Sequence, residues 1–262
     1  MAYDFDGAGD YITFTGATGL GAITAFSLSI WVIDDIPTTT GYRDMFWLGG
    51  SYDTDHNFVF QHDTSNTMEI DIRFSGTNGR WYIAVPDTAW HNYVITYASV
   101  DTTTNALFYK DGVSTAETER STPTLSRAVS TVNTSIIGAA VGGGAEFWNG
   151  KVAEIGVWNR ALTAAEAAIL GAKYSPLFIP NGLVFYAHLV RGLQDLKGGV
   201  GTVTNAVVFA HPRIIYPYSA QMRRFKTAVS TAIKTFNGLA YASTKTVNGL
   251  AIASVKTKNG LA

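Results

Sequence analysis

Apolar and polar side chains alternate with a period of two over much of the first 160 residues. The alternation is strictest in residues 26–32 and 68–74. The apolar positions are Phe26, Leu28, Ile30 and Val32 in the first segment, and Met68, Ile70, Ile72 and Phe74 in the second. A period of two is that of a β-strand, and two unlike faces indicate a strand that covers a core on one side and meets solvent on the other.

The same pattern predicts a series of further short strands. We expect them near residues 10–15, 44–48, 57–61, 80–85, 91–98, 105–110, 134–138 and 150–158. Turn signals such as Asn78-Gly79, Asp111-Gly112 and Asn149-Gly150 separate them. Many short strands at this spacing predict an all-β, antiparallel β-sandwich.

One helix interrupts the strand pattern. Thr163 and Glu166 have the spacing of a capping box, and residues 164–173 are rich in helix formers. Pro176 and Pro180 then end the helix and begin an extended stretch.

The C-terminal segment repeats with a period of eleven residues. Its units begin at Lys234, Lys245 and Lys256, and each contains an Asn-Gly pair typical of a two-residue hairpin turn. A unit this short cannot bury an apolar face alone, so we expect it to assemble with copies of itself or with a partner. The expected assembly residues are Phe236, Leu239, Tyr241, Val247, Leu250 and Ile252. A homo-oligomer, and specifically a trimer, is the expectation; the alternative is a solvated low-complexity tail.

Five blocks of sequence resemble, in order, the framework strands of concanavalin A-like, laminin G-like domains. They are residues 3–12, 26–32, 90–97, 107–112 and 147–163, and the last, with Asn159-Arg160-Ala161-Leu162, is the most specific. The resemblance implies a jelly-roll sandwich over residues 1–175, followed by a connecting extended unit (176–221) and the repeat tail (222–262). The tail is similar to those of tailed-phage virion proteins. This fold serves lectins, glycanases, receptors and spacers, so the resemblance leaves function open.

Residues 69–73 resemble the strand that carries the catalytic carboxylates in retaining glucanases of this fold. The resemblance implies a nucleophile at Glu69, an assisting Asp71 and an acid/base glutamate where this chain has Arg73. Because that mechanism needs two carboxyl groups, Arg73 predicts that the protein is not an enzyme. We expect Glu69 and Asp71 to form the solvent face of an ordinary strand.

Sugar binding needs accessible aromatic rings beside polar groups, and the loop 49–57 is the best region for it. The candidate carbohydrate-binding residues are Trp47, Tyr52, Asp53, Asp55, His56 and Asn57. Tyr42, Trp81 and Trp148 are further aromatic candidates, although most rings in so aromatic a chain should belong to the core.

The family resemblance also implies a structural Ca²⁺, for which Asp6 in the first turn and Glu154 in the closing strand would supply oxygen ligands. The alternative, which we favour, is an exposed pair of acids with no cofactor.

Charge is distributed unevenly along the chain. Residues 222–262 contain seven basic side chains and no acid, whereas the rest carries a net charge of −8. The tail is therefore expected to pack on an acidic surface or to remain solvated. The sequence has no Cys, which excludes disulfides. It shows no signal peptide, transmembrane run, phosphate-binding loop or basic–aromatic stripe, so we expect synthesis in the cytoplasm and no membrane or nucleic-acid partner.

Together these features predict a non-enzymatic structural or decoration protein of a phage virion, located on the capsid or tail surface. Its expected partners are the major capsid or tail protein, further copies of itself and surface glycans. The alternative is a secreted or cell-surface carbohydrate-binding lectin module.

Overall fold

The computed structural model describes most of the first 217 residues and four short strands of the tail. The described ranges are 2–15, 20–21, 23–36, 41–50, 56–84, 88–98, 102–132, 134–140, 143–189, 193 and 199–217, and in the tail 235–236, 239–240, 246–247 and 250–251. The chain divides into two compact units, residues 1–215 and 216–262, which are described separately.

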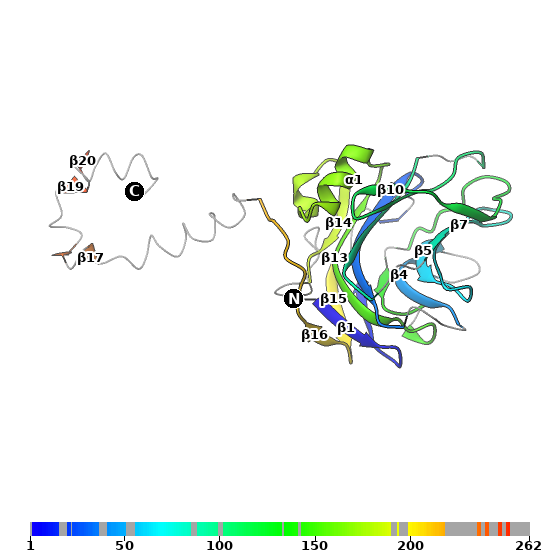
Figure 1. Ribbon diagram of the computed structural model, residues 1–262, viewed down its shortest axis with the longest axis horizontal. Coiled ribbons are helices and arrows are strands. Elements are labelled where there is room, and N and C mark those ends of the chain that lie inside the picture. Colours follow the sequence, from blue (N-terminus) through cyan, green and yellow to red (C-terminus); the bar gives the residue numbers. More distant parts are fainter. Residues whose placement is uncertain are drawn as a thin grey trace. The chain divides into compact units, whose positions relative to one another are not determined.

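The first unit is built from two antiparallel sheets. Sheet A has the order β10 (Val113–Thr115), β9 (Leu107–Lys110), β8 (His91–Tyr97), β3 (Phe26–Asp34), β13 (Asn149–Trp158), β1 (Ala2–Asp6) and β16 (Val207–Phe209), and β14 (Leu183–Ala187) also pairs with β13. Sheet B has the order β11 (Thr118–Ser121), β7 (Gly79–Ala84), β6 (Thr67–Ile72), β5 (His56–His62), β4 (Arg43–Gly49), β12 (Ser135–Ile137), β2 (Tyr11–Thr15) and β15 (Val200–Thr204). The two sheets form the curved layers seen in Figure 1, which confirms the predicted all-β sandwich.

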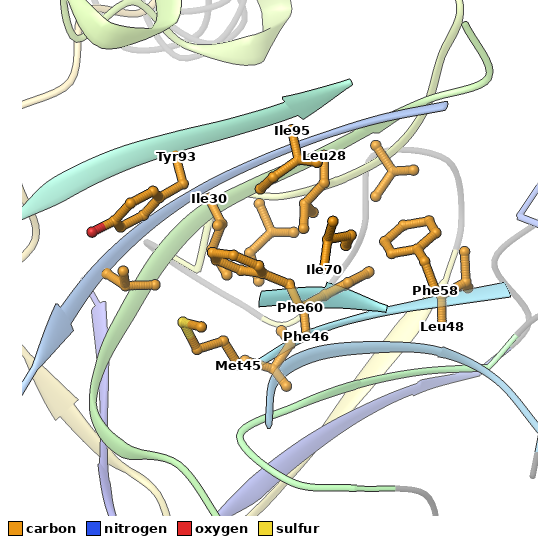
Figure 2. Close-up of a cluster of buried hydrophobic side chains, with 14 of the residues drawn as sticks. Leu28, Ile30, Met45, Phe46, Leu48, Phe58, Phe60, Ile70, Tyr93 and Ile95 are labelled. Carbon is orange, nitrogen blue, oxygen red and sulfur yellow. The ribbon is translucent and has the colours of Figure 1, made fainter. Parts of the chain in front are cut away.

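The core lies between the two sheets, where the apolar faces identified from the alternation meet. Leu28, Ile30 and Ile95 of sheet A face Phe46, Phe60 and Ile70 of sheet B (Figure 2), and all six are fully buried. The rings of Phe26 and Phe58 stack across the gap with centroids 4.0 Å apart. Aromatic burial of this extent stabilises the sandwich by roughly 1.5–3 kcal/mol per side chain.

All ten strands predicted from the alternation are present. The Asp111-Gly112 turn joins β9 to β10, with left-handed φ values of 51° and 79°. The prediction of a turn at Asn149-Gly150 was wrong, because these residues begin β13 and pair with Asp6 and Phe5.

The predicted helix is α1 (Ala164–Gly171), and its capping box is confirmed. The backbone N–H of Glu166 donates to Thr163 Oγ1 at 3.3 Å, and the Thr163 N–H donates to Glu166 Oε2 at 2.8 Å. The helix packs against β8, β9 and β10 on the outer side of sheet A (Figure 1). A short 3₁₀ turn, η2 (Pro176–Phe178), follows.

Residues 176–215 belong to the sandwich, so the expected boundary at 175 lies too early. β14 pairs with β13, β15 with β2 and β16 with β1. Beyond β16, His211 Nε2 lies 3.1 Å from Glu154 Oε1, and Ile215 forms a bridge with Tyr174. The residues that follow β16, from His211 to Ile215, therefore cover part of the outer face of sheet A.

In the second unit, two short antiparallel pairs are described, β17 (Thr235–Phe236) with β18 (Leu239–Ala240) and β19 (Thr246–Val247) with β20 (Leu250–Ala251). Their starts are eleven residues apart, in register with the sequence repeat. Among the expected assembly residues, Tyr241 and Ile252 lie outside the described residues.

Candidate functional site

The outer face of sheet B carries a network of charged and amide side chains. The core-facing residues of β6 are Met68, Ile70 and Ile72, so Glu69 and Asp71 point to the opposite side. The register places Glu69 between Gln61 and Tyr82, and Asp71 between Val59 and Arg80. We define the polar face by Asp44, Gln61, Asp63, Glu69, Asp71, Arg80, Tyr82 and Arg120.

Two arginines join the carboxylates of this polar face. Arg80 NH2 lies 2.8 Å from Asp71 Oδ2, and Arg80 NH1 lies 3.9 Å from Glu69 Oε1. Arg120 NH1 lies 2.9 Å from Glu69 Oε2 and also contacts Asp63. Gln61 Nε2 donates to Glu69 Oε1 at 2.9 Å. Each arginine thereby contacts two carboxylates, which hold its position on the sheet.

The network has a buried floor and a partly exposed upper layer. The Glu69 and Asp71 side chains are 0% and 2% exposed, whereas those of Arg80 and Arg120 are 25% and 26% exposed. The Arg120 guanidinium carbon lies 4.6 Å from the centroid of the half-buried Tyr82 ring. A ligand approaching this face would therefore meet guanidinium N–H donors and an aromatic ring before any carboxylate.

Burial controls the protonation of the floor. It is the main cause that raises the pKa of Glu69 to about 7; Asp71 raises it further, while Arg80 and Gln61 oppose the change. Burial likewise raises the pKa of Asp44 well above its ordinary value, and the adjacent carboxyl groups of Glu146 and Asp71 act in the same direction. The carboxyl groups of this floor therefore take up protons at a higher pH than exposed carboxyl groups do.

A loop over residues 143–147 covers Asp44. The backbone N–H of Asp44 donates to the Glu146 carbonyl at 2.8 Å, and Asp44 forms a bridge with Phe147. A register shift in β4 between Asp44 and Phe46 accompanies the change of side, because Met45 and Phe46 both face the core. Burial is also the main cause that raises the pKa of Glu146.

The predicted carbohydrate-binding residues that the structure describes, Trp47, His56 and Asn57, are all buried. Trp47 is fully buried beside Val59 and Ile136, so the expectation of an exposed platform there was wrong. His56 is buried with Nε2 3.5 Å from Asp71 Oδ1, and Asn57 is buried with its Oδ1 accepting from the Ser130 N–H at 2.8 Å. Tyr52, Asp53 and Asp55 lie outside the described residues. Trp81 and Trp148 are core residues, as the composition suggested.

The predicted calcium ligands are not brought together. Asp6 pairs with Asn149 in the register of β1 and β13, five residues before Glu154 on the same strand. At about 3.3 Å per residue this separates them by roughly 16 Å along the strand. Glu154 is instead buried and accepts a 2.5 Å hydrogen bond from the Tyr186 hydroxyl. The two residues therefore do not fit one Ca²⁺ site, and no group of three or more metal-ligating side chains is found within the described ranges.

Sequence reasoning placed Glu69, Asp71 and Arg73 on one face but did not identify Asp44, Arg80 or Arg120. Arg80 follows Gly79 on the next strand and stands opposite Asp71, so pairing those two strands by register could have found it. Arg120 lies on β11, and neither this four-residue strand nor the preceding three-residue strand β10 is long enough to show a clear alternation. No helix in the described part of the chain is long and apolar enough to cross a membrane.

Comparison with known proteins identifies relatives of the fold. The profile of the concanavalin A-like lectin/glucanases superfamily matches residues 6–168. No curated protein matches. Among solved structures, a Bacteroides ovatus protein described as a candidate carbohydrate binding protein superimposes with a TM-score of 0.54 at 16% identity, over 82% of this chain and 61% of that protein. This chain thus spans less than two thirds of that protein's length.

Two further solved structures are similar to parts of the chain. The heptameric SAP-like pentraxin from Limulus polyphemus also has a TM-score of 0.54 at 16% identity, over 78% of this chain and 95% of the pentraxin. The NanB sialidase from Streptococcus pneumoniae matches with a TM-score of 0.48 at 15% identity, over 64% of this chain and 27% of the sialidase, which is too distant to bear on function.

Proposed function

We propose that this chain, which belongs to the concanavalin A-like lectin/glucanases superfamily, is a carbohydrate-binding module without enzymatic activity. The observation that carries the proposal is the polar face of sheet B. Arg80, Arg120 and Tyr82 offer fixed donors and a ring above a floor of buried carboxylates. Fixed donors suit sugar hydroxyls, because little side-chain freedom remains to be lost on binding. The B. ovatus protein and the pentraxin support the proposal only through their shared fold.

The absence of catalysis rests on the same residues. Arg73 occupies the place of the acid/base glutamate in the glucanase-like segment 69–73. A nucleophile must reach the carbon that it attacks, and Glu69, which takes the nucleophile's place in that pattern, is fully buried with both carboxylate oxygens in contact with Gln61, Arg80 or Arg120. The face therefore suits recognition better than hydrolysis.

A glycan array probed with the full chain tests the binding function. We expect binding to named glycans that Arg120→Ala and Tyr82→Ala each weaken at least tenfold. Arg213→Ala and Tyr174→Ala are the matched controls, since both residues are exposed in segments outside the polar face. If the chain bound no glycan on the array, or if the control variants lost binding equally, the assignment of glycan binding to the polar face would be contradicted.

We further propose that the module is displayed on a phage virion, attached through its C-terminal repeat. The supporting observations are the eleven-residue period, the two strand pairs that follow it, and the seven basic residues without an acid. A basic tail suits an acidic shell of capsid or tail protein. Deleting residues 222–262 and quantifying the protein in purified particles tests this: incorporation should fall, and a higher salt concentration should release the intact protein. Normal incorporation, or recovery only with cell surfaces, would favour a cell-surface lectin instead.

A further inference from the structure

A β-bulge brings a buried carboxyl group to the outer side of sheet A. On β13, Val152 and Ile155 both face the core, whereas Ala153 belongs to a small apolar cluster on the outer face. Glu154 is the additional residue between them, because the register with β3 shifts here and its φ of 49° lies in the left-handed region. A strict alternation would have pointed Glu154 into the core. The bulge instead lets this acid, which is only 1% exposed, meet partners on the outer face.

Two titratable side chains contact the oxygens of this carboxyl group. The Tyr186 hydroxyl donates to Glu154 Oε2 at 2.5 Å and lies 2.9 Å from the Ser175 hydroxyl. His211 Nε2 lies 3.1 Å from Glu154 Oε1, which is the distance of an ion pair although the two groups are not aligned as a hydrogen bond. His188 adjoins the network, with its ring centroid 6.0 Å from that of Tyr186. Among the described residues, the titratable groups of this network from β13, β14 and the segment after β14 are therefore Glu154, Tyr186 and His188.

The second ring nitrogen of His211 indicates its protonation state. Nδ1 lies 2.6 Å from the Pro212 carbonyl oxygen, which can only accept, so Nδ1 carries a hydrogen. In a neutral imidazole the other nitrogen, Nε2, would then present a lone pair to the Glu154 carboxylate. Only the imidazolium has a hydrogen on both nitrogens. The observed contacts therefore fit protonated His211, and histidine is the side chain that ordinarily changes charge between pH 5 and 8.

His211 begins a short segment, residues 211–215, which we call the strap. At its other end, the Ile215 N–H donates to the Lys173 carbonyl at 2.8 Å, and the Ile215 carbonyl accepts from the Ser175 N–H at 2.9 Å. A segment attached through so few contacts can open without unfolding of the sandwich.

The middle of the strap covers aromatic surface on sheet A. Ile214 packs against the outer cluster that contains Trp31, and Trp90 packs there as well. Trp31 is only 4% exposed. The charged side chains of Arg213 and Lys173 are exposed. The strap therefore lies on sheet A through one ion pair, one apolar contact and two backbone hydrogen bonds.

We propose that the strap is releasable, and that the ion pair between His211 and Glu154 holds it on the outer face of sheet A until His211 loses its proton. Release would uncover Trp31. It would also lengthen the chain between the sandwich and the second unit, which begins at Tyr216, by roughly 17 Å, since an extended residue spans about 3.3–3.6 Å. The strap lies on the outer face of sheet A and the polar face on that of sheet B, so this device is independent of glycan binding.

Amide hydrogen exchange of the full chain tests the strap. We expect the protection factor of the Ile215 N–H to fall about tenfold between pH 6 and pH 8.5, as for the loss of one charge-assisted hydrogen bond. A protection factor is referred to an unstructured peptide at the same pH, so the intrinsic effect of pH on exchange is removed. In His211→Ala this N–H should be weakly protected at both pH values. His91→Gln is the matched control, because His91 forms an ion pair of the same kind with Asp111, and it should keep the pH dependence of the wild type.

A disulfide across the strap provides a second measurement, because the chain has no native Cys. Tyr174 and Ile215 are bridge partners and both are exposed, so Tyr174→Cys combined with Ile215→Cys should lock the strap when oxidised. Acrylamide quenching of tryptophan fluorescence should increase from pH 6 to pH 8.5 in the reduced double variant and stay constant in the oxidised one. Circular dichroism at both pH values checks that each variant is folded.

Three results would overturn the proposal. They are a protection factor of the Ile215 N–H that does not change with pH, equal protection in the wild type and in His211→Ala, and a pH-dependent increase in quenching that persists after oxidation. Because these measurements contain no sugar, their outcome is separate from that of the glycan array.

Discussion

Replacing Glu69 with glutamine tests whether the floor of the polar face is governed by burial. The substitution keeps the size of the side chain and an oxygen that can accept from Gln61 Nε2, which lies 2.9 Å from Oε1. It removes the charge that meets Arg80 and Arg120. If ion pairing dominated, the variant should lose stability relative to the wild type most at the pH values where Glu69 is ionised. If burial dominates, the variant should instead compare most favourably with the wild type at those pH values.

The sign and size follow from the pKa of Glu69, which burial raises from 4.5 to about 7. This gap corresponds to about 3 kcal/mol at 1.36 kcal/mol per pKa unit. The folded state holds the proton more tightly than the unfolded state does. The contribution of protonated Glu69 to the free energy of unfolding is therefore fully present below pH 4.5 and is lost as the pH rises through about 7. Glu69→Gln should lack this loss, so its stability relative to the wild type should improve by about 3 kcal/mol from pH 4.5 to pH 8.

The assay is denaturant unfolding followed by tryptophan fluorescence at several pH values from 4.5 to 8. Burial also raises the pKa of Asp34 to about 6, so the stability that this group contributes is likewise lost as the pH rises. Because Asp34 remains in the variant, the curve of stability against pH should become flatter without becoming level. Glu119→Gln, at an exposed position on β11, is the control and should follow the wild type. Parallel curves for Glu69→Gln and the wild type would refute the dominance of burial.

Three further results are expected. Asp44→Asn should stabilise the protein at pH 8 by about 1–3 kcal/mol and less at pH 5, because it removes a buried carboxyl that burial and Glu146 disfavour in its charged form; equal effects in thermal unfolding at both pH values would contradict this. A chain ending at Gln221 should keep the β-type circular dichroism spectrum, since the first compact unit ends at residue 215; an unfolded spectrum would count against the assignment. Trp81→Ala should cost about 3–5 kcal/mol in denaturant unfolding and Trp90→Ala clearly less, because Trp81 is fully buried and Trp90 only half-buried; equal losses would show that Trp90 is also part of the core.

The strands that sequence reasoning found are those with enough length to show a period of two. β3 and β6 each have at least three alternating apolar residues that face the core. β10, β11 and β16 have three or four residues with no fully buried position, so nothing in their local pattern marks a strand. β15 lies in residues 176–221, which were expected to form only a connecting extended unit. It becomes a strand because β2, far earlier in the chain, offers it a partner, and periodicity cannot reveal a non-local pairing.

For the candidate site too, the alternation predicted the face of each residue but not whether that face is exposed. Alternation correctly put Glu69 and Asp71 on the face away from the core, but it also predicted that they would be solvated. They are buried because Arg80 and Arg120, from β7 and β11, lie over them. The same holds for Trp47, which is on the outer side of sheet B and yet fully covered. A strand pattern assigns a residue to a face, whereas other segments decide whether that face meets water.

A carboxyl group with a pKa near 7 is suited to acid–base catalysis, so the raised pKa of Glu69 could also indicate an active site. Its surroundings argue otherwise. A catalytic acid exchanges its proton with a substrate, whereas the oxygens of Glu69 contact Gln61, Arg80 and Arg120 and none of the side chain is exposed. A buried carboxyl that orders two partly exposed arginines stabilises a binding surface, because the donors are oriented before a ligand arrives. Hydrolysis would require this carboxyl to leave its partners in each turnover, and the partner beyond it in the glucanase pattern would still be Arg73. These contacts therefore favour the proposed binding role of the polar face over hydrolysis.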